Sequence, residues 1–153
     1  MTLRNPSGPI KGGDRLLLLS GYHGEITVMD SYQNEPIVVE AASGHTPKIK
    51  SLRCLGASKW VFRGLSISPS HVEPYQTVSY QVSLENHDFR GPCREVTVEN
   101  CTLFSVWDSS CWSIDDWNNL PPSGISADGD DCVVRGNYLR NVDFGISATG
   151  KRV

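Results

Sequence analysis

The chain of 153 residues is long enough for one domain with a substantial core, and its hydrophobic fraction of 39% argues against a disordered protein. A net charge of −3 and dispersed basic residues argue against the concentrated basic face that nucleic-acid binding requires. No apolar run approaches the length of a membrane-spanning helix, so we expect no membrane insertion.

The first twenty residues show no signal peptide, because the apolar run LLLL (16–19) is short and no small-residue cleavage site follows it. Either a leader has been removed, or the protein is made in the cytoplasm and leaves it by another route, as virion components do. We therefore expect a virion or extracellular location.

Short apolar runs separated by glycine and proline follow one another along the chain, and they predict strands. Three runs begin at Leu16 in DRLLLL, at Ile37 in PIVVEA and at Trp60 in KWVFRG, with steps of 21 and 23 residues. A second series consists of Ile26, Ile49 and Ile67. Because no long stretch has helical periodicity, the sequence predicts an all-β chain.

One phrase of two strands joined by a turn residue occurs as WVFRGLSIS (60–68), VTVENCTLF (96–104) and CVVRGNYLR (132–140), at a spacing of 36 residues. Superposition of the phrases aligns Val61 with Thr97 and Val133, Phe62 with Val98 and Val134, and Ile67 with Leu103 and Leu139. The turn positions hold Gly64, Asn100 and Gly136, residue types that accept a positive φ at least steric cost. The phrase GISA at 124–127 also returns at 145–148.

A period in the low twenties with three short strands in each repeat predicts a solenoid, in which each turn of chain lies on the previous one. Parallel strands then complete each other's hydrogen bonds. We expect inward residues such as Val61, Val98 and Val134 to form aliphatic columns. Outward residues should meet solvent, and examples are Arg63, Glu99 and Arg135.

Two segments exceed the basic period and should project as loops, at about 69–81 and 105–123. They carry the aromatic residues Tyr75, Tyr80, Trp107, Trp112 and Trp117. Exposed aromatic rings are suited to stacking on a glycan or docking a protein partner. The alternative is local packing, because a long loop needs a small hydrophobic anchor of its own.

Asp128, Asp130 and Asp131, with Asp115 and Asp116 in the preceding loop, could supply oxygen ligands for calcium. Their spacing does not match an EF-hand, and clusters of Asp and Gly are also ordinary turn chemistry. Apart from calcium, no cofactor is indicated.

The five cysteines are predicted to be free thiols, because their number is odd and no C-x-x-C spacing occurs; they are Cys54, Cys93, Cys101, Cys111 and Cys132. Cys101 and Cys132 fall within the strand phrases, where cysteine behaves as a small buried hydrophobe. Free thiols favour synthesis in a reducing compartment.

The histidines show no metal or catalytic spacing, and we expect surface or turn positions for His23, His45, His71 and His87. Six basic residues could form a stripe for an acidic polysaccharide: Lys48, Lys50, Arg53, Arg63, Arg135 and Arg140. The alternative is an ordinary solvated strand face.

The order of motifs GGDRLLLLSGYHGEITV (12–28), EPIVVEAASGHTPKI (35–49) and WVFRGLSIS resembles the N-terminal coils of right-handed parallel β-helix proteins of the pectate-lyase-like superfamily. The closest likeness is to the chondroitinase B and alginate lyase type, and similar β-helices occur in phage tailspikes. The resemblance implies a right-handed parallel β-helix, and the two long segments would be loops inserted in it. Because the sequence stops at TGKRV directly after the strand phrase FGISA, we expect its C-terminal end to be open, with unpaired strand edges. Residues 1–153 would be a single domain or the N-terminal part of a longer one.

In such lyases a basic residue removes the C5 proton of a uronate, while a cation, often calcium, neutralises the carboxylate. No lysine and arginine pair of this sequence matches that arrangement, so the catalytic residues are unknown and the chain as it stands is not expected to be an enzyme. We expect a structural or recognition module of a larger assembly, such as a phage spike, fibre or capsid decoration, with protein partners, a homotrimer among the options, and affinity for surface glycans. The alternative is the N-terminal part of a secreted polysaccharide lyase acting by β-elimination.

Overall fold

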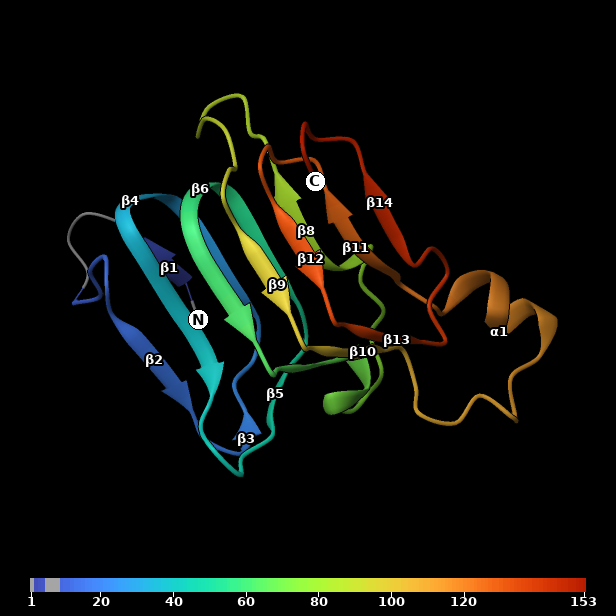
Figure 1. Ribbon diagram of the computed structural model, residues 1–153. Helices are drawn as coiled ribbons and strands as arrows, with labels where there is room; N and C mark the ends of the chain where they lie inside the picture. Colours follow the sequence, from blue (N-terminus) through green and yellow to red (C-terminus); the bar gives the residue numbers. More distant parts are fainter. Residues whose placement is uncertain (1, 5–8) are drawn as a thin grey trace.

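The computed structural model describes residues 2–4 and 9–153, with side chains from residue 9 onward. Its strands form a nine-stranded and a five-stranded sheet, and their paired strands run parallel. Figure 1 shows the strands arranged side by side from the N-terminal to the C-terminal end of the chain. The prediction of an all-β chain is confirmed.

The strands fall into three groups, which we call faces A, B and C. Face A contains β1 (Thr2–Arg4), the first part of β4 (Ile26–Ala41), the first part of β6 (Leu52–Arg63), β8 (Tyr80–Glu85), β11 (Ser123–Ala127) and β14 (Ile146–Ala148). Face B contains β2 (Arg15–Leu18), the second parts of β4 and β6, β9 (Thr97–Glu99) and β12 (Val133–Arg135). Face C, the five-stranded sheet, contains β3 (Gly21–Tyr22), β5 (Pro47–Ile49), β7 (Ser66–Ile67), β10 (Thr102–Phe104) and β13 (Tyr138–Arg140). The chain passes through A, B and C in the same order each time.

The three copies of the repeated phrase align as the sequence predicts. The paired residues are Phe62, Val98 and Val134 in face B, and Ile67, Leu103 and Leu139 in face C. The two GISA segments also lie side by side, because β11 and β14 pair in register. Repetition in the sequence therefore corresponds to adjacency in space.

The turn between faces B and C has the backbone conformation that its residue types predict. Gly64, Asn100 and Gly136 have φ angles of 69°, 53° and 64°. The turns also bond to one another along the stack, since the Gly64 N–H donates to Glu99 O and the Asn100 N–H donates to Arg135 O. A residue type that disfavours positive φ would disturb the stacked turns if it replaced one of these three residues.

Part of the predicted register is wrong. Leu16 pairs with Val39, shifted by two residues from Ile37, whereas Ile37 pairs with Trp60 as the predicted step requires. Ile26 lies in face A opposite Leu52, away from the other two members of its predicted series. A period read from apolar residues alone does not detect such shifts.

Val61 does not belong to the interior column in which the sequence placed it. Val61 is half-buried and pairs with Thr97, whereas the next residue, Phe62, is fully buried. Because side chains alternate between the two sides of a strand, Phe62 and not Val61 joins Val98 and Val134. The predicted column is therefore wrong in its first residue, which is Phe62 and not Val61.

The outer side of face B carries a row of alternating charges. Arg63 Nε lies 3.1 Å from Glu99 Oε1, and Arg135 Nη2 lies 2.7 Å from Glu99 Oε2. Arg63 Nε is also 3.6 Å from Glu40, which pairs with Arg15. The Glu99 side chain is only 8% exposed, so the expectation that it meets solvent is wrong. The charges of this row compensate one another.

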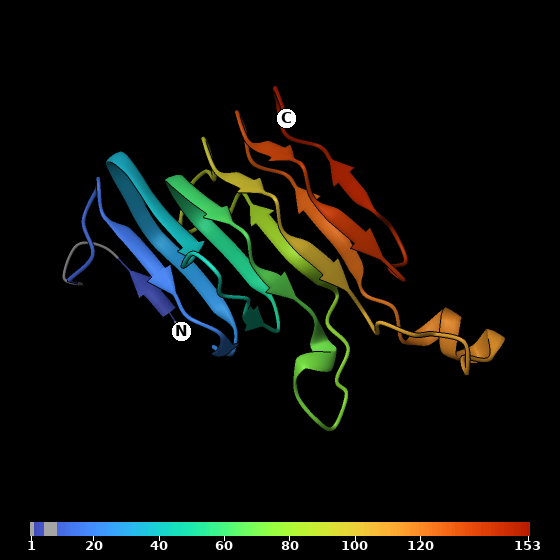
Figure 2. The same cartoon turned by 60° about the horizontal axis from the view of Figure 1, so that its bottom comes forward.

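The two predicted loops connect face C to face A, and Figure 2 shows them extending beyond the strands. The first contains the 3-10 helix η1 (Pro69–His71), and the second contains α1 (Ile114–Asn119). Both predicted loops run too far, because β8 begins at Tyr80 and β11 at Ser123. A further connection, 86–96 between β8 and β9, was not predicted. No helix in the described part of the chain is long and apolar enough to cross a membrane.

All five cysteines are free, as predicted. Cys101 and Cys132 are buried, but they lie between strands and not inside them: Cys101 separates β9 from β10, and Cys132 precedes β12. Cys111, in the loop with α1, is exposed.

Candidate ligand-binding face

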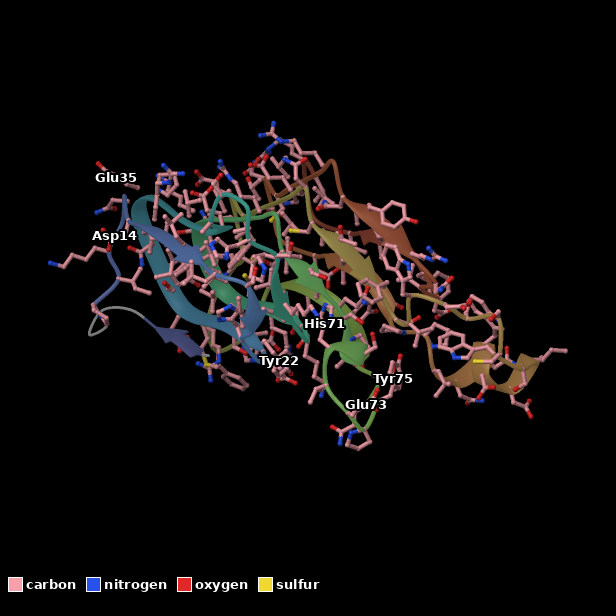
Figure 3. All side chains as sticks on the ribbon, turned by 90° about the horizontal axis from the view of Figure 1, so that it is seen from below. Asp14, Tyr22, Glu35, His71, Glu73 and Tyr75 are labelled. Carbon is pink, nitrogen blue, oxygen red and sulfur yellow. The ribbon has the colours of Figure 1, made fainter. Side chains whose placement is uncertain are left out.

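The outer side of face C carries a row of side chains, one from each strand. Their register partners run in the order Tyr22, Lys48, Ser66, Thr102 and Tyr138. With neighbouring strands about 4.8 Å apart, the row is about 19 Å long. Its terminal tyrosines are 44% and 52% exposed, whereas Ser66 is buried. Figure 3 views the molecule from this side, with Tyr22 and His71 labelled. The row forms an extended surface with an aromatic ring at each end.

A hollow of about 390 Å³ lies at the centre of this row. Its floor and turn-side rim are formed by Gly64, Leu65, Ser66, Asn100 and Thr102. The other residues that line it are Thr46, Lys48, His71, Phe104 and Trp107. The volume is in the range of small-molecule sites in proteins.

His71 is held over the hollow by its own short helix. The Ser68 side chain caps η1 by accepting a 3.0 Å bond from the Ser70 N–H. His71 Nε2 then lies 2.9 Å from Ser66 Oγ, and the imidazole packs edge-on against Phe104 with ring centroids 5.3 Å apart. His71 thus connects the first loop to the floor of the hollow.

Burial, followed by the nearby positive charge of Lys48, lowers the pKa of His71 to about 4. The imidazole is therefore neutral at neutral pH. Lys48 is exposed and forms no ion pair with any residue in the described part of the chain. The hollow consequently offers one uncompensated cation beside a neutral base.

Trp107 provides the aromatic wall of the hollow. Trp107 is 54% exposed. Its ring lies edge-on to Phe104, with ring centroids 5.3 Å apart, and its centroid is 6.4 Å from that of Tyr138. The Arg140 guanidinium lies 4.8 Å from the Trp107 ring centroid, a cation–π arrangement. Of the aromatic residues predicted to contact a ligand, Trp107 is the one that lines this hollow.

The other predicted contact residues lie elsewhere. Trp112 and Trp117 pack against each other with centroids 5.0 Å apart, which corresponds to the alternative of local loop packing. The Tyr75 hydroxyl donates a 2.8 Å bond to Leu120 O and so joins the two loops. Tyr80 belongs to β8 in face A. The five aromatic residues therefore do not form one surface.

The aspartates considered for calcium contact the segment 149–152. The Thr149 hydroxyl donates a hydrogen bond to Asp128, and the Lys151 N–H donates one of 2.9 Å to Asp130. The Arg152 side chain donates to Asp131. The hydrogen bond from Arg152 lowers the pKa of Asp131. Asp115 and Asp116 lie apart in α1, where Asp116 completes a capping box with Ser113. Within residues 9–153, no group of three or more His, Cys, Asp or Glu is arranged to hold a metal ion. Calcium binding stays a prediction.

The predicted basic stripe does not exist as one surface. Its members are Lys48 and Arg140 in face C, Arg53 in face A, Arg63 and Arg135 in face B, and Lys50 directly after β5. Lys50 pairs with Glu25 at 3.4 Å, and Arg53 pairs with Glu85 at 3.2 Å. The face C surface retains only Lys48 and Arg140 from this set.

Sequence reasoning missed the row of face C, although the repeated phrase contains its signal. Ser66, Thr102 and Tyr138 each stand two residues after the turn position, so their alignment was already available. His71 carries no such signal, because it lies in a loop outside the repeat.

No family model matches the chain, and no curated protein or solved structure shows significant similarity to it.

Proposed function

We propose that the chain is a right-handed parallel β-helix that serves as a structural and recognition module of a larger assembly, such as a virion spike, fibre or capsid decoration. The repeated passage through faces A, B and C with parallel register supports the solenoid part of this proposal. In this module, the outer side of face C binds a surface glycan.

The row on face C carries the proposal for glycan binding. A linear glycan needs an extended surface with aromatic rings for stacking and polar groups for its hydroxyls. Tyr22 and Tyr138 supply exposed rings at the ends of the row, and Trp107 supplies one beside the central hollow. The uncompensated Lys48 favours a glycan that carries acidic groups.

Binding of acidic oligosaccharides from alginate, chondroitin and pectin, followed by isothermal titration calorimetry, tests this function. Trp107→Ala should weaken binding by about tenfold through loss of one stacking ring. Trp117→Ala, in the same loop but packed against Trp112, should leave the affinity unchanged. Equal losses in the two variants, or no binding of any of these glycans by the parent chain, would contradict the proposal.

The assembly part of the proposal has an independent test. The free cysteines favour synthesis in a reducing compartment, as for virion components made in a cytoplasm. Light scattering coupled to size exclusion should give a mass above that of the monomer, with a trimer as one expected state. A monomer at all concentrations would remove self-assembly from the proposal and leave glycan binding untouched.

The second candidate function is that of a polysaccharide lyase acting by β-elimination. One observation favours it: the hollow places the neutral imidazole of His71, a proton acceptor, beside the cation Lys48. His71 would remove the C5 proton of a uronate while Lys48 neutralises the carboxylate. The C4–O bond then breaks, a C4=C5 double bond forms, and the departing oxygen takes a proton from water. Absorbance of the unsaturated product from alginate, chondroitin or pectin tests it. Turnover that His71→Gln abolishes and His87→Gln retains would establish the lyase instead of a purely binding module.

A further inference from the structure

A second hollow, of about 430 Å³, lies on the outer side of face A. It is formed where β6 and β8 begin, and Arg53 of β6 and Ser83 of β8 are register partners there. Ser51 and Ser83 are buried polar residues that line it. Arg53, Glu85 and Tyr80 project around them. The lining is therefore polar and contains one aromatic ring.

The charges that line this hollow are paired. Arg53 Nη2 lies 3.2 Å from Glu85 Oε1, and the Ser83 hydroxyl donates to the same carboxylate oxygen. Glu25 at the rim is 3.4 Å from the Lys50 ammonium. Face A thus presents no excess charge here, in contrast to Lys48 on face C.

The paired groups still have hydrogen-bonding capacity toward a ligand. The side chains of Arg53 and Glu85 are 52% and 30% exposed. In the described chain, the Arg53 Nε and Nη1 groups and the Glu85 Oε2 atom make no hydrogen bond with another residue. A sugar hydroxyl both donates and accepts, so it can bridge such a guanidinium and carboxylate pair.

Tyr80 extends the hollow into a longer groove. Tyr80 is 41% exposed, and it lines both this hollow and a neighbouring one of about 350 Å³ toward β14. The neighbouring hollow is more apolar, with Phe144 and Ile146 in its lining. A tyrosine between a polar and an apolar hollow is placed to stack on a sugar ring that has both kinds of surface.

We propose that this face A groove binds an uncharged sugar unit, with Tyr80 stacking on the ring and with Arg53 and Glu85 bonding its hydroxyls. The site is separate from face C and does not depend on the ligand proposed there. Charge balance is the reason for assigning a neutral sugar, because an acidic unit would meet Glu85 and Glu25 without a free cation.

Calorimetry on the intact chain with neutral oligosaccharides of glucose, galactose, mannose or rhamnose tests the proposal. At least one should bind, and Tyr80→Ala should weaken that binding by about tenfold or more. Tyr80→Phe should retain it, because the ring remains, and this variant also guards against loss of fold as the cause. Phe89→Ala, which removes an exposed ring from the connection 86–96 outside both proposed binding faces, is the control and should bind normally.

The salt dependence of binding distinguishes the site on face A from the site on face C. Raising the salt from about 0.05 M to 0.5 M should leave neutral-sugar affinity within about twofold, whereas acidic-glycan binding at face C should weaken markedly. The proposal is overturned if no neutral sugar binds, or if Tyr138→Ala abolishes binding while Tyr80→Ala does not. It is also overturned if Tyr80→Ala abolishes self-association of the chain and no sugar binding is found, because a second copy would then occupy the groove.

Discussion

Faces B and C are built by the same repeated phrase, but they differ in how their outward polar residues are satisfied. On face B, the carboxylate of Glu99 lies between the guanidinium groups of Arg63 and Arg135. On face C, Lys48 has no acidic partner in the described chain, and Tyr138 exposes half of its surface. The strand pairing is parallel on both faces, so the difference lies in side chains alone.

This difference is the basis on which we propose a different role for each face. Charges that compensate one another, with the carboxylates nearly buried, leave little for a ligand to gain, and they fix neighbouring strands. An uncompensated cation beside exposed aromatic rings does not stabilise the fold, and it is available for binding. We therefore expect substitutions on face B and in the interior to change stability, and substitutions on face C to change binding.

The largest effect is expected for Phe62→Ala. Phe62 is fully buried, so the change should lower the free energy of unfolding by about 3–5 kcal/mol. Val61→Ala, one residue earlier on the outward side, should cost less than about 1 kcal/mol. Denaturant unfolding followed by circular dichroism measures both. Similar losses in the two variants would show that the assignment of inside and outside in β6 is wrong.

Gly136→Val should have the next largest effect, a loss of about 1–3 kcal/mol. Gly136 has a φ of 64°, and a Cβ atom there would collide with the Asn100 side-chain oxygen of the turn below. Gly145→Val is the control, because a Cβ atom at Gly145 meets no atom within 4 Å. Thermal melting should separate the two variants, and a wild-type melting curve for Gly136→Val would reject the stacked turn.

Glu99→Gln compares the two faces directly. The change removes the charge between two arginines and should lower the free energy of unfolding by about 1–2 kcal/mol, with no change in glycan affinity. Lys48→Gln should do the reverse, leaving stability within about 0.5 kcal/mol of the parent and weakening acidic-glycan binding. If Lys48→Gln destabilised the chain as much as Glu99→Gln, face C would be structural as well.

The repeated phrase made much of the strand register predictable. Identical spacing aligned Phe62 with Val98 and Val134, and the residue type at Asn100 identified the turn between the two strands. The same reasoning failed at Val61, because an apolar outward residue beside an apolar inward one hides the alternation along the strand. Apolarity alone does not fix which side of a strand is buried.

The loops were predictable in position but not in contacts. The position of His71 over Ser66 depends on a helix of three residues and on Phe104 from a strand much later in the chain. The connection 86–96 lies in the same repeat as the first loop. The extra length of that repeat was assigned to the first loop alone, so the connection was missed. Such contacts join residues with no common spacing, so no pattern in one sequence reveals them.

The last prediction concerns the pH dependence of stability through His71. Its pKa is about 4 in the folded chain, against an ordinary value of 6.5 for an accessible histidine. The unfolded chain therefore binds the proton more strongly, and the contribution of His71 to stability is complete above about pH 6.5. That contribution is lost progressively as the pH falls from about 6.5 to about 4, and His71 causes no further loss below that pH.

His71→Gln should flatten the fall in unfolding free energy between about pH 6.5 and pH 4, measured by denaturant titration at several pH values. His87→Gln, in the connection 86–96, is the control and should retain the slope of the parent. Lys48→Gln adds a finer test, because the positive charge of Lys48 contributes to the lowered pKa of His71. In that variant, the imidazole pKa followed by NMR should rise toward its ordinary value while remaining below it, since burial is the larger cause. An unchanged His71 pKa in Lys48→Gln would show that the charge of Lys48 does not influence the imidazole across the hollow on face C.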